Sequence, residues 1–172
     1  MLFDARPLEG YPEPYDLLCA ILQDGTNEWR WEIDPELGED AVVWQPYPGA
    51  QSIGAIMLHI INVEIIWFER VALEIPPDPN ERKLLMADET DVDEAVWPVP
   101  HHKPISWYFD LHDQIRARTL ERIKEWGHPA STQDLHGDAR SMRWILGHVI
   151  QHEAYHGGQI VLLHQLWKRS QG

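Results

Sequence analysis

The amino-acid sequence predicts an all-α protein built as a four-helix bundle. Two observations support this prediction. Apolar residues recur at helical spacing in four long stretches, and no segment shows the sustained apolar–polar alternation that is typical of a strand. The chain has 172 residues, of which 44% are hydrophobic, so it is long enough to bury a sizeable core. We therefore expect a single helical bundle domain over residues 1–172.

The first two helices are predicted in the amino-terminal half. The first runs from about residue 14 or 15 to residue 30 along an apolar stripe, and Gly25 weakens its middle. The second begins after Ser52, a good N-cap, and continues through Ile75. The pair Pro76-Pro77 ends it, because proline lacks the amide hydrogen that a helix needs.

The other two helices are predicted in the carboxy-terminal half. The third covers residues 104–126, and Gly127 follows as a C-terminal stop. The fourth covers residues 141–168, with Ser141 as its N-cap. This last segment carries most of the residues that point to chemistry.

The connections between the helices differ greatly in length. Residues 42–44, Val-Val-Trp, could form a short extended piece between the first two helices. The acidic, proline-rich connection over residues 76–103 is unusually long for a compact domain. Such a connection would let the third helix run parallel to the second by crossing the end of the bundle.

Charge and cysteine content exclude several classes of function. The net charge is −14, so the surface repels nucleic-acid phosphates and anionic lipids. We expect neither nucleic-acid nor membrane binding. The single cysteine, Cys19, allows no internal disulfide and is expected to be an inert buried side chain. No secretory signal and no long uncharged apolar stretch is visible, which predicts a cytoplasmic protein.

Three histidines in the fourth helix form a candidate metal site. His148, His152 and His156 stand four residues apart, so their imidazoles lie roughly in a column on one helix face. Two histidines at this spacing can both bind one small cation. The question is which residue supplies the next ligand.

The segment His152–His156 matches the H-E-x-x-H pattern of zinc proteases, but the surrounding sequence argues against that class. A metzincin would need glycine and histidine where Gln159 and Leu162 stand. No glutamate follows Glu153 to serve as a downstream ligand, and no strand is predicted to align a peptide substrate. We therefore look for the third ligand upstream.

His59 is the best upstream candidate. It lies in the middle of the second helix, within an otherwise apolar stretch. In a bundle, a histidine on one helix can meet a pair on the facing helix across the core. Three imidazoles with an open coordination position are typical of catalytic metal sites, whereas structural zinc sites are usually closed by four protein ligands.

These segments resemble the DinB-like (YfiT-type) superfamily of small helical metalloproteins. The resemblance lies in SIGAIMLHIINVE, preceded by WQPYPG, and in GHVIQHEAYHGGQI near the carboxy terminus. The family signature of one histidine, then H-x-x-x-H followed closely by G-Q, falls on His59, His152, His156, Gly158 and Gln159. The similarity covers the second and fourth helices well, and the first and third only in layout.

The resemblance implies a fold, a metal and a chemistry. It implies a four-helix bundle with an up-down-down-up course, a divalent metal bound by the three histidines, and frequent dimerisation. Family members with assigned activity are transferases and isomerases that use bacillithiol, mycothiol or glutathione. Others are described as metal-dependent hydrolases. The family thus fixes the site better than the reaction.

Several neighbouring residues have two interpretations. Glu153 could act as general base for a metal-bound water, or it could form an ion pair within the bundle. His148 could be a fourth ligand, a support for a ligand, or a wall residue. Glu64 could orient an imidazole or form a salt bridge. Gln159 could line the pocket or fix a helix contact, and His112 could face the same cavity or be an ordinary interior or surface histidine.

We therefore expect His59, His152 and His156 to hold one divalent ion, zinc or nickel. The open coordination position would activate a low-molecular-weight thiol in a transferase or isomerase, or water in a hydrolase, acting on a small-molecule substrate. The alternative is a non-enzymatic protein of the stress response that binds a metal or a small molecule. The resemblance adds a homodimer as the expected assembly.

Overall fold

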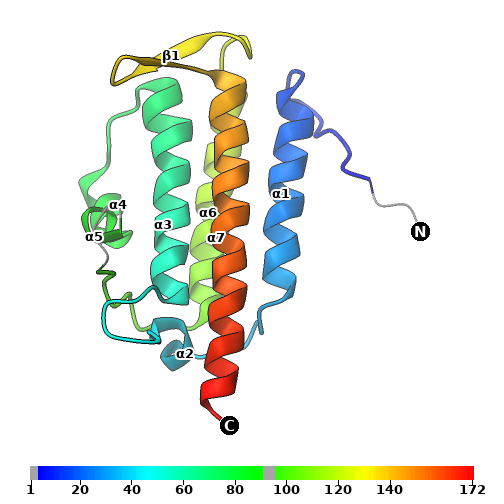
Figure 1. Ribbon diagram of the computed structural model, residues 1–172. Helices are drawn as coiled ribbons and strands as arrows, with labels where there is room; N and C mark the ends of the chain where they lie inside the picture. The colour runs from blue at the N-terminus through cyan, green and yellow to red at the C-terminus, as the bar shows by residue number, and fades with distance from the viewer. Residues whose placement is uncertain (1–3, 91–95) are drawn as a thin grey trace.

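The computed structural model describes residues 4–90 and 96–172, in which four long helices pack as a bundle (Figure 1). These helices are α1 (Tyr15–Trp31), α3 (Ile53–Ile65), α6 (Ile105–Ile123) and α7 (Met142–Ser170). Helices α1 and α7 run in one direction, and α3 and α6 run in the other (Figure 1). The predicted all-α bundle with an up-down-down-up course is therefore confirmed.

Shorter elements complete the fold. A π-helical segment, η1 (Ile66–Val71), continues α3 directly. Three short helices and one hairpin lie in the connections: α2 (Glu39–Val43), α4 (Pro79–Leu84), α5 (Ala87–Thr90), β1 (Thr132–Leu135) and β2 (Asp138–Ser141). No helix in the described part of the chain has both the length and the apolar character needed to cross a membrane.

The second predicted helix is shorter and less regular than expected. Its N-cap is confirmed, because the Ser52 hydroxyl accepts a hydrogen bond from the Ala55 amide. The α-helix then gives way to the π-helical turn η1, and helical structure ends at Leu73. Glu74 adopts a left-handed backbone conformation with φ of 57°, so the helix stops before the proline pair rather than at Ile75.

The long connection after η1 makes α3 and α6 parallel. It descends beside α3 and contains α4 and α5, and α5 packs against α3 (Figure 1). The Asp78 carboxylate caps α4 by accepting from the Asn80 amide, and Pro79 occupies the first turn, where no amide partner is needed. The predicted long crossover and the parallel course of α3 and α6 are thus confirmed, but the connection runs beside α3 rather than across the end of the bundle, and it contains two short helices.

Two local predictions were wrong. Val42 and Val43 lie in α2 rather than in an extended piece, because the acidic first turn at Glu39 and Asp40 favours a helix start and Val42 is buried against the core. The hairpin β1–β2 was not predicted at all. Its strands span only four residues each and are largely polar, so they carry no apolar alternation. His136 and Gly137 form its tight turn with φ of 56° and 86°.

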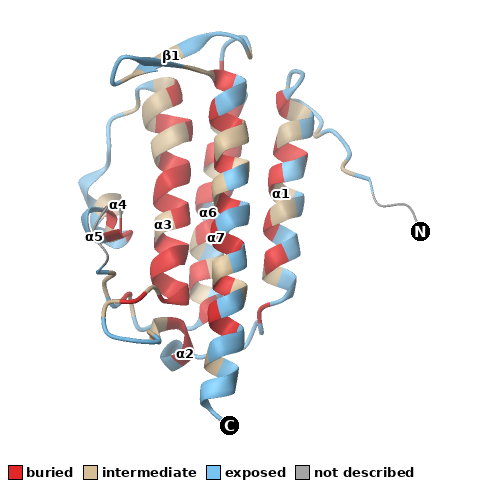
Figure 2. Cartoon of the chain, viewed as in Figure 1, coloured by how far each residue is buried: buried red, intermediate tan, exposed pale blue. Residues whose placement is uncertain are grey.

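Helix α3 is buried along nearly its whole length (Figure 2). It packs against α6, α7 and α5. Every residue of α3 except His59 is buried. His59 is therefore the only residue of this apolar helix that is partly exposed.

Helix α1 approaches α7 closely at one glycine. A Cβ atom placed on Gly157 would lie 2.6 Å from the Cγ and Cδ1 atoms of the Trp29 indole. Real side chains do not tolerate this approach, so the two helices can pack at this depth only with glycine. The neighbouring Gly158 has open space around the same position.

We expect Gly157→Ala to destabilise the fold by about 1–2 kcal/mol, since overpacking against the Trp29 ring outweighs the gain in helix propensity. The matched control Gly158→Ala should be neutral or stabilising by up to about 1 kcal/mol. Urea unfolding monitored by circular dichroism measures both variants. Equal stability of the two would contradict the close approach of α1 to α7.

Candidate metal centre

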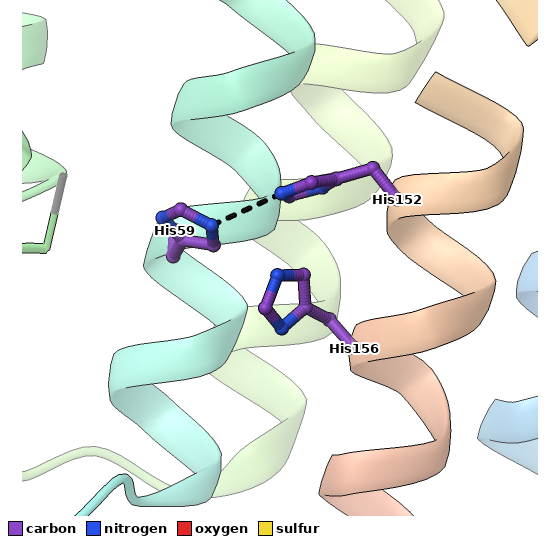
Figure 3. A group of neighbouring side chains, drawn as sticks. All are labelled: His59, His152 and His156. Atoms are coloured by element: carbon purple, nitrogen blue, oxygen red, sulfur yellow. Dashed lines mark hydrogen bonds between the residues drawn. The ribbon is translucent and has the colours of Figure 1, made fainter. Parts of the chain in front are cut away.

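Three histidines from two antiparallel helices converge on one point. His59 projects from α3, and His152 and His156 project from successive turns of α7 toward it (Figure 3). The Nε2 atoms of His59 and His152 are 3.1 Å apart. One ring nitrogen from each of the three residues lies within 4.8 Å of the others. Residues 93 positions apart in the chain therefore meet as the sequence predicted.

The spacing and the donor type fit a divalent cation. Two nitrogen ligands at about 2.0–2.1 Å from a tetrahedral zinc ion lie roughly 3.3 Å apart. The separation of 3.1 Å between His59 and His152 is close to that value. Imidazole nitrogens suit zinc, nickel and other first-row ions. Within the residues that the structure describes, this group consists of the three histidines.

Hydrogen bonds set which nitrogen of two rings faces the centre. The Nδ1 atom of His59 lies 2.9 Å from the Thr90 carbonyl oxygen, and Nδ1 of His156 lies 2.6 Å from Oε1 of Gln159. Both partners are acceptors, so each Nδ1 carries the hydrogen and donates it. The lone pair then remains on Nε2, which is the usual way in which an outer partner orients a metal-binding imidazole. Gln159 thus orients the His156 ring from within the same helix.

The surroundings keep the α7 imidazoles in the neutral form. Burial, together with the neighbouring rings of His156, His59 and His148, lowers the pKa of His152 to about 3. Burial also lowers the pKa of His156, partly offset by its bond to Gln159. Neutral imidazole is the form that binds metals, so both rings are in the form that a cation requires at neutral pH.

His148 forms part of the wall beside the cluster. Its ring stacks on Trp144 with centroids 4.8 Å apart and an angle of 8° between the planes. Trp67 from η1 meets the same ring edge-on at 4.8 Å. The His148 ring lies 6.1 Å from the His152 ring and is not a member of the three-histidine group. Of the interpretations considered, the wall residue describes it best.

Glu153 points away from the histidines into a buried polar network. Its Oε1 accepts from the Thr26 hydroxyl at 2.6 Å and from the Trp29 indole at 3.2 Å. Its Oε2 accepts from Nη2 of Arg116 at 2.5 Å. Both oxygens are engaged, so the general base expected at Glu153 is not supported by its contacts. The bundle ion pair, the other interpretation, matches this geometry.

Glu64 and His112 belong to the same network. Arg116 donates from Nε to Oε1 of Glu64 at 2.9 Å and from Nη2 to Oε2 at 2.8 Å. His112 is fully buried, with Nε2 3.6 Å from Glu64 Oε2, and its Nδ1 accepts from Arg30 at 2.7 Å. Glu64 therefore forms a salt bridge and does not support His59. His112 is an interior residue outside the histidine cluster.

Glu64, His112 and Glu153 also offer ligand atoms within 4.8 Å of one another. The Arg116 guanidinium bonds to both carboxylates and supplies the positive charge there. Sequence reasoning missed this arginine. The signal was present, because Tyr108, His112 and Arg116 repeat every four residues along the apolar face of α6.

Cys19 takes no part in either cluster. It is fully buried in α1, and burial raises the pKa of its thiol to about 12. A thiol in this state is a weak nucleophile, as the sequence predicted for an inert side chain.

Comparisons with known proteins give a family and agree with the fold. The sequence profile of the mycothiol-S-transferase family matches residues 17–168, a range that contains all three histidines. The crystal structure of a DinB-like protein from Bacillus cereus ATCC 10987 superposes with a TM-score of 0.60, over 86% of this chain and 90% of that chain. The two sequences are 16% identical, so this likeness shows the fold alone. The comparison with curated proteins finds no match.

The buried carboxylate of Glu64 predicts a specific dependence of stability on pH. Burial alone would raise its pKa, but the charge of Arg116 and the hydrogen bonds from His112 and Arg116 outweigh this effect and lower it well below the ordinary 4.5. The unfolded chain therefore binds a proton that the folded protein does not bind in this range. The stabilisation is complete above about pH 4.5 and is lost as the pH falls toward the folded pKa.

We expect Glu64→Gln to lower the free energy of unfolding by about 3 kcal/mol at pH 7, because it leaves Arg116 with one fewer buried counter-charge. The variant should also lose stability less steeply than the unmodified protein as the pH falls below 4.5. Urea unfolding at several pH values measures both effects. Glu121→Gln, at an exposed position of α6, is the control, and equal slopes for all three proteins would refute the prediction.

Proposed function

The chain belongs to the mycothiol-S-transferase family, and we propose that it is a metal-dependent S-transferase that acts with a low-molecular-weight thiol of the mycothiol type. His59, His152 and His156 would hold one divalent ion, zinc or nickel. The observation that carries the proposal is the convergence of these three imidazoles from α3 and α7. The family match supports the choice of a thiol as co-substrate.

The reaction would join the thiol sulfur to an electrophilic carbon of a small molecule. The sulfur–carbon bond forms, the bond to the leaving group breaks and takes its electron pair with it, and the thiol proton passes to solvent. A divalent ion at the centre would lower the pKa of the thiol and so favour the thiolate, which is the nucleophilic form.

The protein's own side chains would hold the ligands rigid for this task. Acceptors at Thr90 and Gln159 fix the rings of His59 and His156. Trp97 meets the His59 ring edge-on at 5.6 Å, and Tyr155 meets the His156 ring at 5.1 Å. Each of these aromatic rings contacts the ring of one of the three histidines.

The position of His148 favours an enzyme over a closed metal-storage or structural site. A closed site would use this histidine as a further ligand from the same column. Its ring instead stacks on Trp144, outside the group of three. An external thiol can then complete the coordination, which is what the proposed transfer requires.

Removal of one ligand tests the metal site. We expect His59→Ala to weaken cobalt binding by more than about 100-fold, because even the loss of a supporting partner costs about 10- to 100-fold. Gln159→Leu, which removes the acceptor from His156, should fall in that lower range. His102→Ala, at an exposed position, is the control. Titration of the metal-free proteins with cobalt measures the affinities, and unchanged binding by His59→Ala would rule out the site.

Addition of thiol to the cobalt-loaded protein tests the proposed chemistry. We expect mycothiol to produce a sulfur-to-cobalt charge-transfer band, because a thiolate would complete the coordination. The S-methyl derivative, which has no ionisable thiol, should produce none. The zinc-loaded protein should then accelerate the consumption of mycothiol by an alkylating electrophile. Silence of the spectrum with several thiols would favour a hydrolase or a binding protein instead.

A further inference from the structure

We propose that Arg116 is the positioning residue of the candidate metal centre. Its guanidinium ties α3 to α7 from inside the bundle and so holds His59 at binding distance from His152. The metal itself rests on the function proposed above, but the positioning of the two rings is a property of the protein alone.

The ion network flanks the ligands on both helices that carry them. Glu64 follows His59 by five residues on α3, or about 8 Å along the helix axis. Glu153 directly follows His152 on α7. Arg116 of α6 bonds to both carboxylates, and its Nη2 atom contacts the two of them. One planar group therefore sets the distance between α3 and α7 at the level of the histidines.

The same bond also sets how α7 is rotated. Successive residues on a helix point about 100° apart. When Arg116 holds Glu153 toward the bundle interior, His152 is turned toward His59 on α3. The Thr26 hydroxyl of α1 accepts from Nη1 of Arg116 at 2.9 Å and lies 2.6 Å from Glu153, so the first helix joins the same arrangement.

Stability alone is a poor explanation for this cluster. The side chain of Arg116 is 8% exposed, and those of Glu64 and Glu153 are 0% and 3% exposed. Burying such charges costs about as much as their attraction returns, and apolar replacements are often neutral or stabilising. What a guanidinium offers instead is a rigid fork with fixed bond directions. A metal site needs that kind of support, because its ligands must hold to within about 0.5 Å.

The chain contains a matched control on the same helix. Arg118 also bridges two carboxylates, with Nε 2.8 Å from Glu69 and Nη1 2.7 Å from Glu81. This second fork joins α6 to η1 and α4, and it does not involve α7. It has the same chemistry, but its carboxylates lie outside α3 and α7, the two helices that carry the histidines.

The experiment compares two charge-free triple variants. Arg116→Met with Glu64→Gln and Glu153→Gln removes the central fork without leaving a buried charge unpaired. Arg118→Met with Glu69→Gln and Glu81→Gln removes the control fork. Nuclear Overhauser effects between the imidazole ring protons of His59 and His152, whose ring centroids are 4.9 Å apart, report the geometry in the metal-free protein. Cobalt titration of the same samples reports the affinity.

We expect the Arg116 triple variant to stay folded, lose the cross-ring effects and bind cobalt at least tenfold more weakly. The control triple variant should keep both properties. Arg116→Lys retains the charge but not the planar fork, so it should also lose the cross-ring effects and bind cobalt more weakly. This variant replaces the triple variant in the test if the triple variant does not fold. Unchanged cross-ring effects without Arg116, or equal losses in both triple variants, would overturn the proposal. Loss of the cross-ring effects in the Arg116 variants, but not in the control, would support the proposed role of Arg116. This holds even if the unmodified protein binds no cobalt. Failure to bind cobalt would count only against the proposed function.

Discussion

The antiparallel contact between α3 and α7 is the constraint on which the rest of this structure depends. It places His59 against His152 across 93 residues of sequence. The long connection after η1 makes this contact possible, because it returns the chain to the start of α6 and leaves α7 to run against α3 (Figure 1). A conventional short turn between η1 and α6 would have reversed α6, and α7 would then have run parallel to α3.

The two sides of this helix pair carry opposite kinds of chemistry. On the outer side stand neutral imidazoles whose pKa values are lowered by burial, as at His152 and His156. On the inner side stand the guanidinium of Arg116, whose pKa is raised, and the carboxylate of Glu64, whose pKa is lowered, together with Glu153. Neutral imidazole nitrogens can bind a cation without electrostatic repulsion. The ion network meanwhile fixes the two helices that carry the imidazoles.

The sequence predicted what depends on local periodicity or on the order of histidines along the chain. The four long helices, the caps at Ser52 and Ser141 and the meeting of three histidines follow from such patterns. The hairpin and α2 were missed because elements of only four or five residues are too short to show an apolar period. The π-helical turn after Ile65 and the partners of Arg116 were missed because they are set by packing between distant elements, which no local pattern records.

The orientation of each ligand comes from a different part of the fold. Gln159 orients His156 from the next turn of the same helix, which is a local effect that spacing can predict. His59 is oriented by the Thr90 carbonyl of α5, so the crossover contributes to the site as well as returning the chain. His152 directly precedes Glu153, whose carboxylate accepts a hydrogen bond from Arg116. The geometry of the centre is therefore set jointly by α7, by the crossover and by the bundle interior, and a change in any of the three should alter how the imidazoles meet.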